Sequence, residues 1–233
     1  MVINVKTAME TQSNIRWFTL LLSAIAGYCD TATFIAGNGT FSAHVTGNFI
    51  IFAAQAVLDA DPNAWIKLIT LPVFVIAVIT GGWLAAKTGK RYLLLLTEGI
   101  LLLLAGGAAF WLGADQSGRY AIVMLTVLAL GLQNAFGRLF PKETHGPTTM
   151  MTGNVTQASL DLGNLLWKGF KADQLSQESI KKQLYLIGGF LVGCLAGGLL
   201  AKWIGLESIF FPGLTMTIFY FTQSDRRLKD SSI

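Results

Sequence analysis

The sequence predicts an all-α membrane protein. Of its 233 residues, 53% are hydrophobic and only 13% are charged, and the mean hydropathy is +0.56. Soluble domains carry about 25% charged residues, so the charged fraction is about half of the usual value. Several apolar stretches are also long enough for a helix to cross a hydrocarbon core about 30 Å thick. Together these observations place the chain in a lipid bilayer.

The same composition argues against several other classes of protein. Two cysteines, Cys29 and Cys194, exclude a disulfide scaffold, a four-cysteine zinc site and a cysteine-ligated iron–sulfur cluster. With only two histidines, His44 and His145, a histidine-rich metal centre is not expected either. The net charge of +4 is too small to suggest nucleic acid and fits membrane orientation better. We therefore expect no metal, no cofactor and no nucleic acid. The expected partners are the lipid bilayer and a small solute or ion.

Six stretches have the length and composition of membrane spans. The last of them carries Pro212-Gly213, which leaves its ends uncertain. Two further segments, 41–58 and 148–167, are apolar but interrupted, and the second is too polar to face lipid. The six predicted spans are residues 17–35, 69–86, 92–112, 120–140, 184–204 and 206–222.

A repeated pattern organises these segments. Val45-Thr46-Gly47-Asn48 recurs as Met151-Thr152-Gly153-Asn154, and segment 74–85 aligns without gaps on segment 190–201. Before each motif, a glycine is followed three residues later by a polar residue: Gly27 with Asp30, and Gly131 with Asn134. The order of segments is the same in both halves, which predicts an internal duplication of roughly 100 residues, as in many transporters. We expect one integral membrane domain, 1–233, with repeats at about 17–112 and 120–222.

Positive charges distinguish two topologies, because loops rich in Lys and Arg stay in the cytoplasm. If all eight segments cross the membrane, eleven of the 17 Lys and Arg residues fall on one side. If segments 41–58 and 148–167 are re-entrant, one side holds fourteen, all except Lys67, Arg119 and Lys202. The second topology distributes the positive charges more unevenly between the two sides of the membrane. It predicts about six spans in two inverted repeats, with broken or re-entrant Thr-Gly-Asn helices that enter from opposite faces.

This topology also fixes the expected location of the chain ends and of the main loop. Both termini are expected in the cytoplasm. Residues 168–182 form the longest polar loop and carry four lysines. We expect a solvated cytoplasmic loop near anionic headgroups, not a binding site.

Thr46-Gly47-Asn48 and Thr152-Gly153-Asn154 are the first candidate site. Each motif is expected to begin a short helix, where Thr or Asn can cap backbone N–H groups and Gly allows a tight entry. A helix start inside the membrane presents a positive dipole end and free N–H groups. Irregular backbone at that depth has to be buried in protein or line a water-filled cavity. Two interpretations stay open: a paired pore or binding site, or two caps that hold short helices in place.

Asp30 and the equivalent position in the second repeat extend this candidate path. Asp30 lies thirteen residues into the first predicted span, about 20 Å along a helix. An ionisable group at that depth marks an ion, proton or substrate path by default. Asn134, preceded by Gln133, stands at the equivalent position. A charge in one half alone suits a cation or proton site, and a hydrogen-bonded structural role for Asp30 is the alternative.

Three other polar residues lie within or beside apolar segments. His44 precedes the first motif by two residues and is either a titratable gate near neutral pH or a hydrogen-bonding structural residue. Asp161 lies two turns beyond the second motif and faces either the cavity or the headgroups. Glu98 is expected to extend towards Lys90 or Arg91 at the cytoplasmic face.

Glycines indicate where helices approach closely. Small residues at four-residue spacing let membrane helices pack backbone to backbone. Gly189, Gly193 and Gly197 form such a stripe, with Gly198 beside it. We expect the stripe to pack the two repeats together. A dimer interface is the alternative, so a homo-oligomer stays open. The expected packing residues are Gly81, Gly82, Gly189, Gly193, Gly197 and Gly198.

The same motifs resemble those of a known family. Ala26-Gly27-Tyr28-Cys29-Asp30 and His44-Val45-Thr46-Gly47-Asn48 resemble segments of the YoaK-like family of uncharacterised bacterial membrane proteins. Gly131-Leu132-Gln133-Asn134-Ala135, followed by Thr152-Gly153-Asn154, extends the resemblance from about residue 17 to residue 221. The resemblance implies a bacterial multi-pass inner-membrane protein of about six spans. It implies no substrate.

Three functional hypotheses follow. The first is a secondary transporter or channel for a small solute or ion, because two helix starts and Asp30 converge on one region. The second is a membrane-embedded enzyme, which needs clustered acid–base or nucleophilic groups. The candidates for that role are few, and no nucleotide or hydrolase motif occurs, so we expect no enzyme. The third is a structural or regulatory membrane partner without transport activity.

Overall fold

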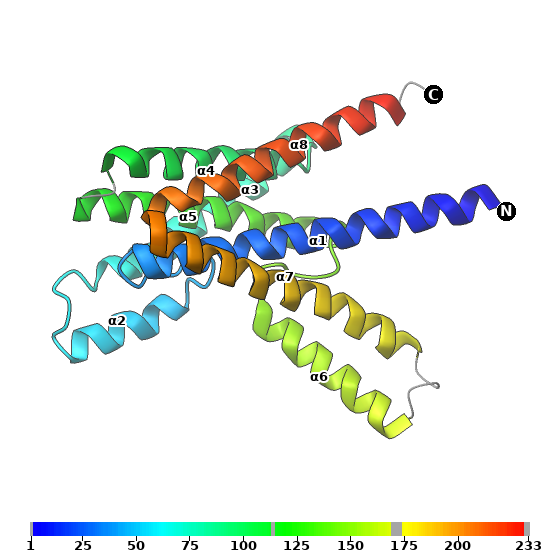
Figure 1. The fold of residues 1–233 in the computed structure, drawn as a ribbon, viewed down its shortest axis with the longest axis horizontal. Helices are drawn as coiled ribbons and strands as arrows, with labels where there is room; N and C mark the ends of the chain where they lie inside the picture. The colour runs from blue at the N-terminus through cyan, green and yellow to red at the C-terminus, as the bar shows by residue number, and fades with distance from the viewer. Residues whose placement is uncertain (1, 113–114, 169–173, 231–233) are drawn as a thin grey trace.

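The computed structural model describes residues 2–112, 115–168 and 174–230, and side chains from residue 13 to residue 222 within those ranges. Every regular element in these ranges is helical (Figure 1). The elements are α1 (Val2–Ala36), α2 (Gly47–Val57), α3 (Ile66–Thr88), α4 (Leu93–Leu112), α5 (Gln116–Leu139), α6 (Met151–Lys168), α7 (Gln174–Ile204), the 3₁₀ helix η1 (Gly205–Ile209) and α8 (Phe210–Asp230).

Five stretches of the described chain are long and apolar enough to cross a membrane: Ser13–Ala36, Ile66–Thr88, Leu93–Leu112, Gln116–Leu139 and Gln174–Thr222. The fifth contains a reversal. Gly205 has a φ of +68°, and α7 and α8 run in opposite directions on either side of η1 (Figure 1). The fifth stretch therefore consists of two antiparallel helices, and the predicted class of a multi-pass α-helical membrane protein is confirmed.

The reversal also corrects the predicted start of the last span. That span was expected at 206–222, but α8 begins at Phe210, because residues 205–209 form the 3₁₀ turn. Pro212 then lies in the first turn of α8, where its missing N–H breaks no helical hydrogen bond. At the other end of α7, residues 174–182 of the expected 168–182 loop are already helical. Residues 169–173, with Lys171 and Asp173, lie outside the described residues.

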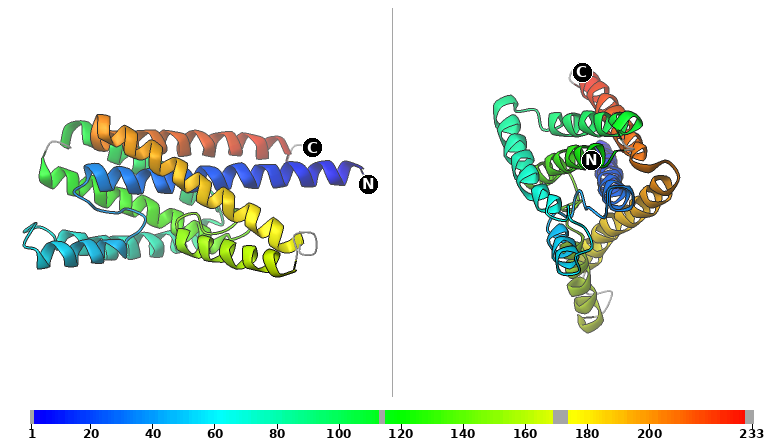
Figure 2. Two further views of the ribbon diagram at one scale, coloured as in Figure 1. Left: turned by 60° about the horizontal axis from the view of Figure 1, so that its bottom comes forward. Right: turned by 90° about the vertical axis from the view of Figure 1, so that its left-hand side faces the viewer.

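Two helices do not cross the bundle. α2 and α6 each begin near its middle and run outward to opposite ends (Figures 1 and 2). The 11 residues of α2 extend over about 16 Å, roughly half of a hydrocarbon core. The chain returns to the middle before each of them, through residues 37–46 and 140–150. The 18 residues of α6 extend over about 27 Å. Both Thr-Gly-Asn segments thus begin helices near the middle of the bundle, and the two chain termini lie at the same end (Figure 1).

The outer surface is apolar. Large apolar side chains are exposed along several helices, among them Leu191, Leu195 and Leu199 of α7. In a soluble protein such a surface would face water unfavourably. All six tryptophans are more than half exposed: Trp17, Trp65, Trp83, Trp111, Trp167 and Trp203. Amphipathic tryptophan rings favour the membrane–water interface. This distribution is that of a multi-pass membrane protein.

Close packing of α1 against α7 forms the centre of the bundle. A Cβ atom on Gly193 would lie 1.9 Å from the carbonyl oxygen of Ala24, and one on Gly197 would lie 2.3 Å from that of Tyr28. A Cβ on Gly189 would lie 2.8 Å from the carbonyl oxygen of Leu20. Three glycines one turn apart therefore let the two backbones touch. The stripe packs within the chain.

The other predicted packing residues differ among themselves. Gly81 of α3 faces α5, where its Cβ would lie 2.8 Å from the Cβ of Ala135. A Cβ on Gly198 would lie 3.2 Å from Cγ2 of Thr31 in α1, which is tighter than an ordinary van der Waals contact. Gly82, in contrast, has no atom within 4 Å of an added Cβ, so it packs against nothing described in the chain.

Candidate functional site

Asp30 holds the loop that leads into α2. Its carboxylate is buried in α1, and Oδ1 accepts backbone N–H groups from Ser42 (2.8 Å), Ala43 (2.7 Å) and His44 (3.3 Å). Oδ2 pairs with Nδ1 of His44. One carboxylate thus satisfies three successive N–H groups of an irregular segment, which membrane depth would otherwise make costly. These contacts agree with the alternative interpretation of Asp30 as a hydrogen-bonded structural residue.

Asn48 closes the same loop from the other side. Its carbonyl oxygen accepts the N–H of Phe41 at 2.8 Å, and its amide donates to the carbonyl of Phe41 at 2.8 Å and to Oγ1 of Thr70 at 3.0 Å. The expected side-chain cap is wrong for Thr46, which precedes α2 in a helical conformation and makes no side-chain cap hydrogen bond. Gly47 follows it as the first residue of α2, where a Cβ would press against the Phe41 ring at 3.1 Å. The motif therefore fastens the loop to the helix rather than capping N–H groups.

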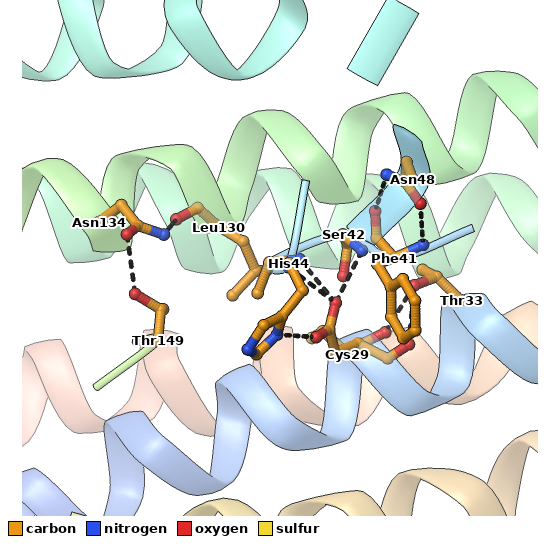
Figure 3. A network of polar contacts seen from close by, with 11 residues as sticks. Cys29, Thr33, Phe41, Ser42, His44, Asn48, Leu130, Asn134 and Thr149 are labelled. Atoms are coloured by element: carbon orange, nitrogen blue, oxygen red, sulfur yellow. Dashed lines mark hydrogen bonds and ion pairs between the residues drawn. The ribbon is translucent and has the colours of Figure 1, made fainter. Parts of the chain in front are cut away.

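The loop that leads into α6 is held in a related way. Asn134 of α5 accepts the hydroxyl of Thr149 at 2.8 Å, and Asn154 donates to the carbonyl of Pro147 at 2.8 Å. Gln133 donates to Oγ1 of Thr148 at 2.8 Å and to the carbonyl of Leu22 at 2.9 Å. The second loop has fewer bonds, because Pro147 offers no N–H and Asn134 carries no charge. Figure 3 shows contacts of the first loop and, from the second, the hydrogen bond of Thr149 to Asn134, with His44 drawn between them.

Replacing each motif asparagine with alanine is expected to give unequal losses of stability. Asn48→Ala removes three hydrogen bonds and leaves the Phe41 backbone unpaired, whereas Asn154→Ala removes one bond to a backbone oxygen. At about 1 kcal/mol per bond, we expect losses of about 3 and about 1 kcal/mol. Unfolding in a detergent series, followed by tryptophan fluorescence, measures both. Equal losses would show that the two loops are held alike.

The pairing of His44 with Asp30 gives stability a defined pH dependence. The hydrogen bond to Asp30 raises the pKa of His44, against the opposing effect of burial. A raised folded-state pKa stabilises below the unfolded value and loses that effect as pH rises through the folded value. His44→Gln should therefore cost more at about pH 5.5 than at about pH 9. Thermal unfolding at both pH values measures the difference.

His145 provides the control with the opposite sign. It lies in the loop before α6, and burial lowers its pKa, with help from Lys182 and Arg16. A lowered pKa disfavours the folded state at low pH, so His145→Gln should improve relative stability at about pH 5.5. If both variants showed the same pH trend, the assignment of the His44 effect to Asp30 would be wrong.

A cavity of about 460 Å³ lies where the two loops meet. Its walls come from both loops, from α3 and α5 and from the start of α6. Its volume is in the range of small-molecule sites, and most of its lining is apolar. The lining residues are Ala43, His44, Val45, Thr46, Leu71, Phe74, Val78, Asn134, Ala135, Arg138, Thr149, Met150, Met151, Thr152 and Gly153.

The cavity brings together part of the predicted site. His44 and Thr46 from the first loop face the same space as Asn134, Thr152 and Gly153 from the second half. The rest of the predicted set is not in the lining: Asp30, Gly47, Asn48, Gln133, Asn154 and Asp161. The motif asparagines hold the loops, and their neighbours face the cavity.

Arg138 and Thr149 are lining residues that sequence reasoning missed. Arg138 lies one turn beyond Asn134 in α5, and residues four apart share a helix face. That spacing was available in the sequence. Thr149 carried no comparable signal, because its role depends on the return of the loop to α5.

Two buried carboxyl groups lie away from the cavity. Glu98 of α4 is fully buried, and neither of its oxygens has a hydrogen-bond partner among the described residues. The expected contact with Lys90 or Arg91 is wrong, because Arg91 pairs with Glu143 instead. Asp161 of α6 accepts one hydrogen bond from Gln157 at 3.0 Å.

A smaller polar cavity lies at the end of the bundle that carries the termini. Its volume is about 220 Å³, and three cations, Arg16, Lys181 and Lys182, line it together with His145, Glu178 and Tyr185. Basic residues at a membrane surface attract anionic headgroups. Among the described residues, no three His, Cys, Asp or Glu side chains come together as a group that could hold a metal ion.

Comparison with known proteins identifies the family of this chain. The family model described as protein of unknown function (DUF1275) matches residues 18–222. This chain belongs to the DUF1275 family. No curated protein matches it, and no solved structure does. The DUF1275 match includes both re-entrant helices and every residue of the larger cavity, and it carries no activity with it.

Proposed function

We propose that this DUF1275 protein is a secondary transporter or channel, rather than an enzyme, that moves a small solute or ion across the bacterial inner membrane. The cavity between the starts of α2 and α6 carries the proposal. Transporters bind their substrates near the membrane midplane, where broken helices meet. Irregular backbone at that depth is tolerated where it lines a water-filled cavity. Here two irregular loops, one from each half, end at a single cavity.

Paired contacts support an internal duplication. A Cβ on Gly27 of α1 would lie 2.2 Å from the carbonyl oxygen of Phe190 in α7. At the equivalent positions of the sequence repeat, a Cβ on Gly131 of α5 would lie 3.4 Å from the carbonyl oxygen of Phe74 in α3. Related pairs of helices thus pack through related residues. A duplicated fold whose halves insert in opposite directions gives each membrane face its own half-helix, as alternating access requires.

Charge distribution supports the orientation that we propose. The end of the bundle that carries both termini also holds the connection between α3 and α4, with Lys90 and Arg91, and the smaller cavity, with Arg16, Lys181 and Lys182. Lys67, Arg119 and Lys202 lie near the opposite end, at the start of α3, the start of α5 and the end of α7. Because positive charge concentrates on the cytoplasmic side, both termini are assigned to the cytoplasm. We also propose that the chain is related to the YoaK-like proteins that its motifs resemble.

Filling the cavity tests the proposal. Gly153 lines it and has no atom within 4 Å of an added Cβ, so Gly153→Trp places an indole in the cavity without a backbone clash. Gly82→Trp adds the same side chain where nothing packs, and serves as the matched control. Flux of radiolabelled chloride, potassium, benzoate, alanine and glycerol is measured in proteoliposomes. We expect Gly153→Trp to abolish a flux that Gly82→Trp retains. Wild-type flux of none of these solutes, or equal flux in both variants, would contradict the proposal.

A further inference from the structure

Arg138 lies in the cavity wall with an exposed side chain. Nη2 of Arg138 contacts Sδ of Met150 at 3.4 Å. No carboxylate lies within ion-pair distance of Arg138 in the described part of the chain. A thioether is only a weak acceptor, so the contact offsets little of the charge. A guanidinium next to apolar surface is stabilised by an anion that it can bind through two parallel hydrogen bonds.

The rest of the lining adds no acidic side chain. None of its residues is Asp or Glu. Asp30, the nearest acid in the network, is outside the lining, and its oxygens are already engaged by the first loop. His44 presents its ring to the cavity while Nδ1 pairs with Asp30. The cavity therefore offers positive charge and no negative charge to a bound solute.

The apolar part of the lining defines the other half of the ligand. Leu71, Phe74 and Val78 form one wall from α3. Burying apolar surface against this wall favours a ligand with an apolar body. An inorganic anion would leave this wall without a partner, whereas an anion with an apolar body would use both features.

We propose that this cavity binds a small organic monoanion, with its carboxylate at Arg138 and its apolar body against Leu71, Phe74 and Val78. The inference rests on the proposed function and names its substrate class. It replaces the cation expected from the sequence, because the acid on which that expectation depended holds backbone N–H groups.

Binding of three matched probes tests the charge preference. Benzoate, benzyl alcohol and benzylammonium share a ring and differ in charge. Their binding to the purified full-length protein in maltoside detergent is measured by calorimetry. We expect benzoate to bind at least tenfold more tightly than the other two, because a hydrogen-bonded ion pair contributes at least about 1.4 kcal/mol. Equal affinities, or a preference for benzylammonium, would overturn the proposal.

Variants locate the bound charge. Arg138→Gln is expected to weaken benzoate binding about tenfold, and Arg138→Lys to restore most of it, since one charge–charge contact remains. Lys202→Gln removes an exposed cation outside the cavity and should change nothing. Gly153→Trp should abolish binding by occupying the space. If Arg138→Gln bound benzoate as wild type does, the proposed site would be wrong.

A lipid headgroup is the other source of an anion for Arg138, and nanodiscs distinguish the two. Thermal stability is compared in phosphatidylcholine discs and in discs that contain phosphatidylglycerol. If phosphatidylglycerol stabilises wild type but not Arg138→Gln, and benzoate has no effect on either, then Arg138 binds lipid and the proposal fails. If benzoate stabilises wild type in phosphatidylcholine alone, the proposal holds.

The two proposals fail separately. Flux of chloride, potassium, alanine or glycerol that Gly153→Trp blocks, without benzoate binding, would keep the transport function and reject the organic anion. Benzoate binding that depends on Arg138, in a protein that moves no solute, would keep the anion site and reject transport.

Discussion

Gly193→Ala is expected to destabilise the protein by about 3 kcal/mol, the upper part of the range for overpacking. The new methyl carbon would lie 1.9 Å from the carbonyl oxygen of Ala24 and 2.6 Å from its carbonyl carbon. Both atoms are backbone, so relief requires α1 and α7 to separate along their whole contact. Loss of stability is measured as the shift in thermal unfolding in detergent, followed by tryptophan fluorescence.

Gly188→Ala is the matched control for this variant. It adds the same methyl group to the same helix, five residues earlier, where no atom lies within 4 Å. Because alanine favours a helix over glycine by about 1 kcal/mol, this variant should be neutral or slightly stabilised. Similar unfolding temperatures for the two variants would show that the two helices do not touch at Gly193.

Asp30→Ala is expected to cost about 3 to 5 kcal/mol, the cost of removing one partner from a buried charged cluster. Three N–H groups of residues 42–44 and the ring of His44 lose their acceptor together. The loop before α2 then has no partner for its polar groups. Unfolding free energy and the flux of the proteoliposomes are measured on the same preparation, and both are expected to fall.

Two further variants provide reference values for the stability that Asp30→Ala loses. Asp30→Asn keeps an acceptor for the N–H groups but loses the charge that faces His44, so its cost should be intermediate. Asp161→Ala removes a carboxyl of similar burial that accepts one hydrogen bond, from Gln157, and should cost about 1 kcal/mol. If Asp30→Asn abolished transport at full stability, Asp30 would act on the solute path directly, and its assignment to the loop alone would be wrong.

Much of the architecture was predictable because bilayers impose simple rules. Span length follows from the thickness of the hydrocarbon core, and the placement of cationic residues favoured re-entrant segments over eight crossings. The stripe of Gly189, Gly193 and Gly197 predicted a close helix contact, and α1 provides it. These features depend on local sequence and on the solvent, so a single chain is enough to predict them.

The details of the site were less predictable because they depend on tertiary contacts. Spacing alone suggested that Thr46 and Asn48 cap a helix, but the loop folds back, so Asn48 binds Phe41 and Thr70 instead. Glu98 was expected at the cytoplasmic face, yet α4 turns it into the core without a partner. Neither outcome follows from the order of residues, because each depends on the direction in which a helix faces its neighbours.

Water access to the cavity tests the central claim most directly. Thr46 and Thr152 are each replaced by cysteine in a background that carries Cys29→Ala and Cys194→Ala, and a charged methanethiosulfonate reagent is applied to proteoliposomes. Leu199→Cys, on the exposed apolar face of α7, is the control. Both threonine positions are expected to react at least about tenfold faster than Leu199→Cys, since the reagent needs ionised thiolate and water. Rates at both positions as slow as that of Leu199→Cys would show that the cavity is closed to water, and would contradict the solute path.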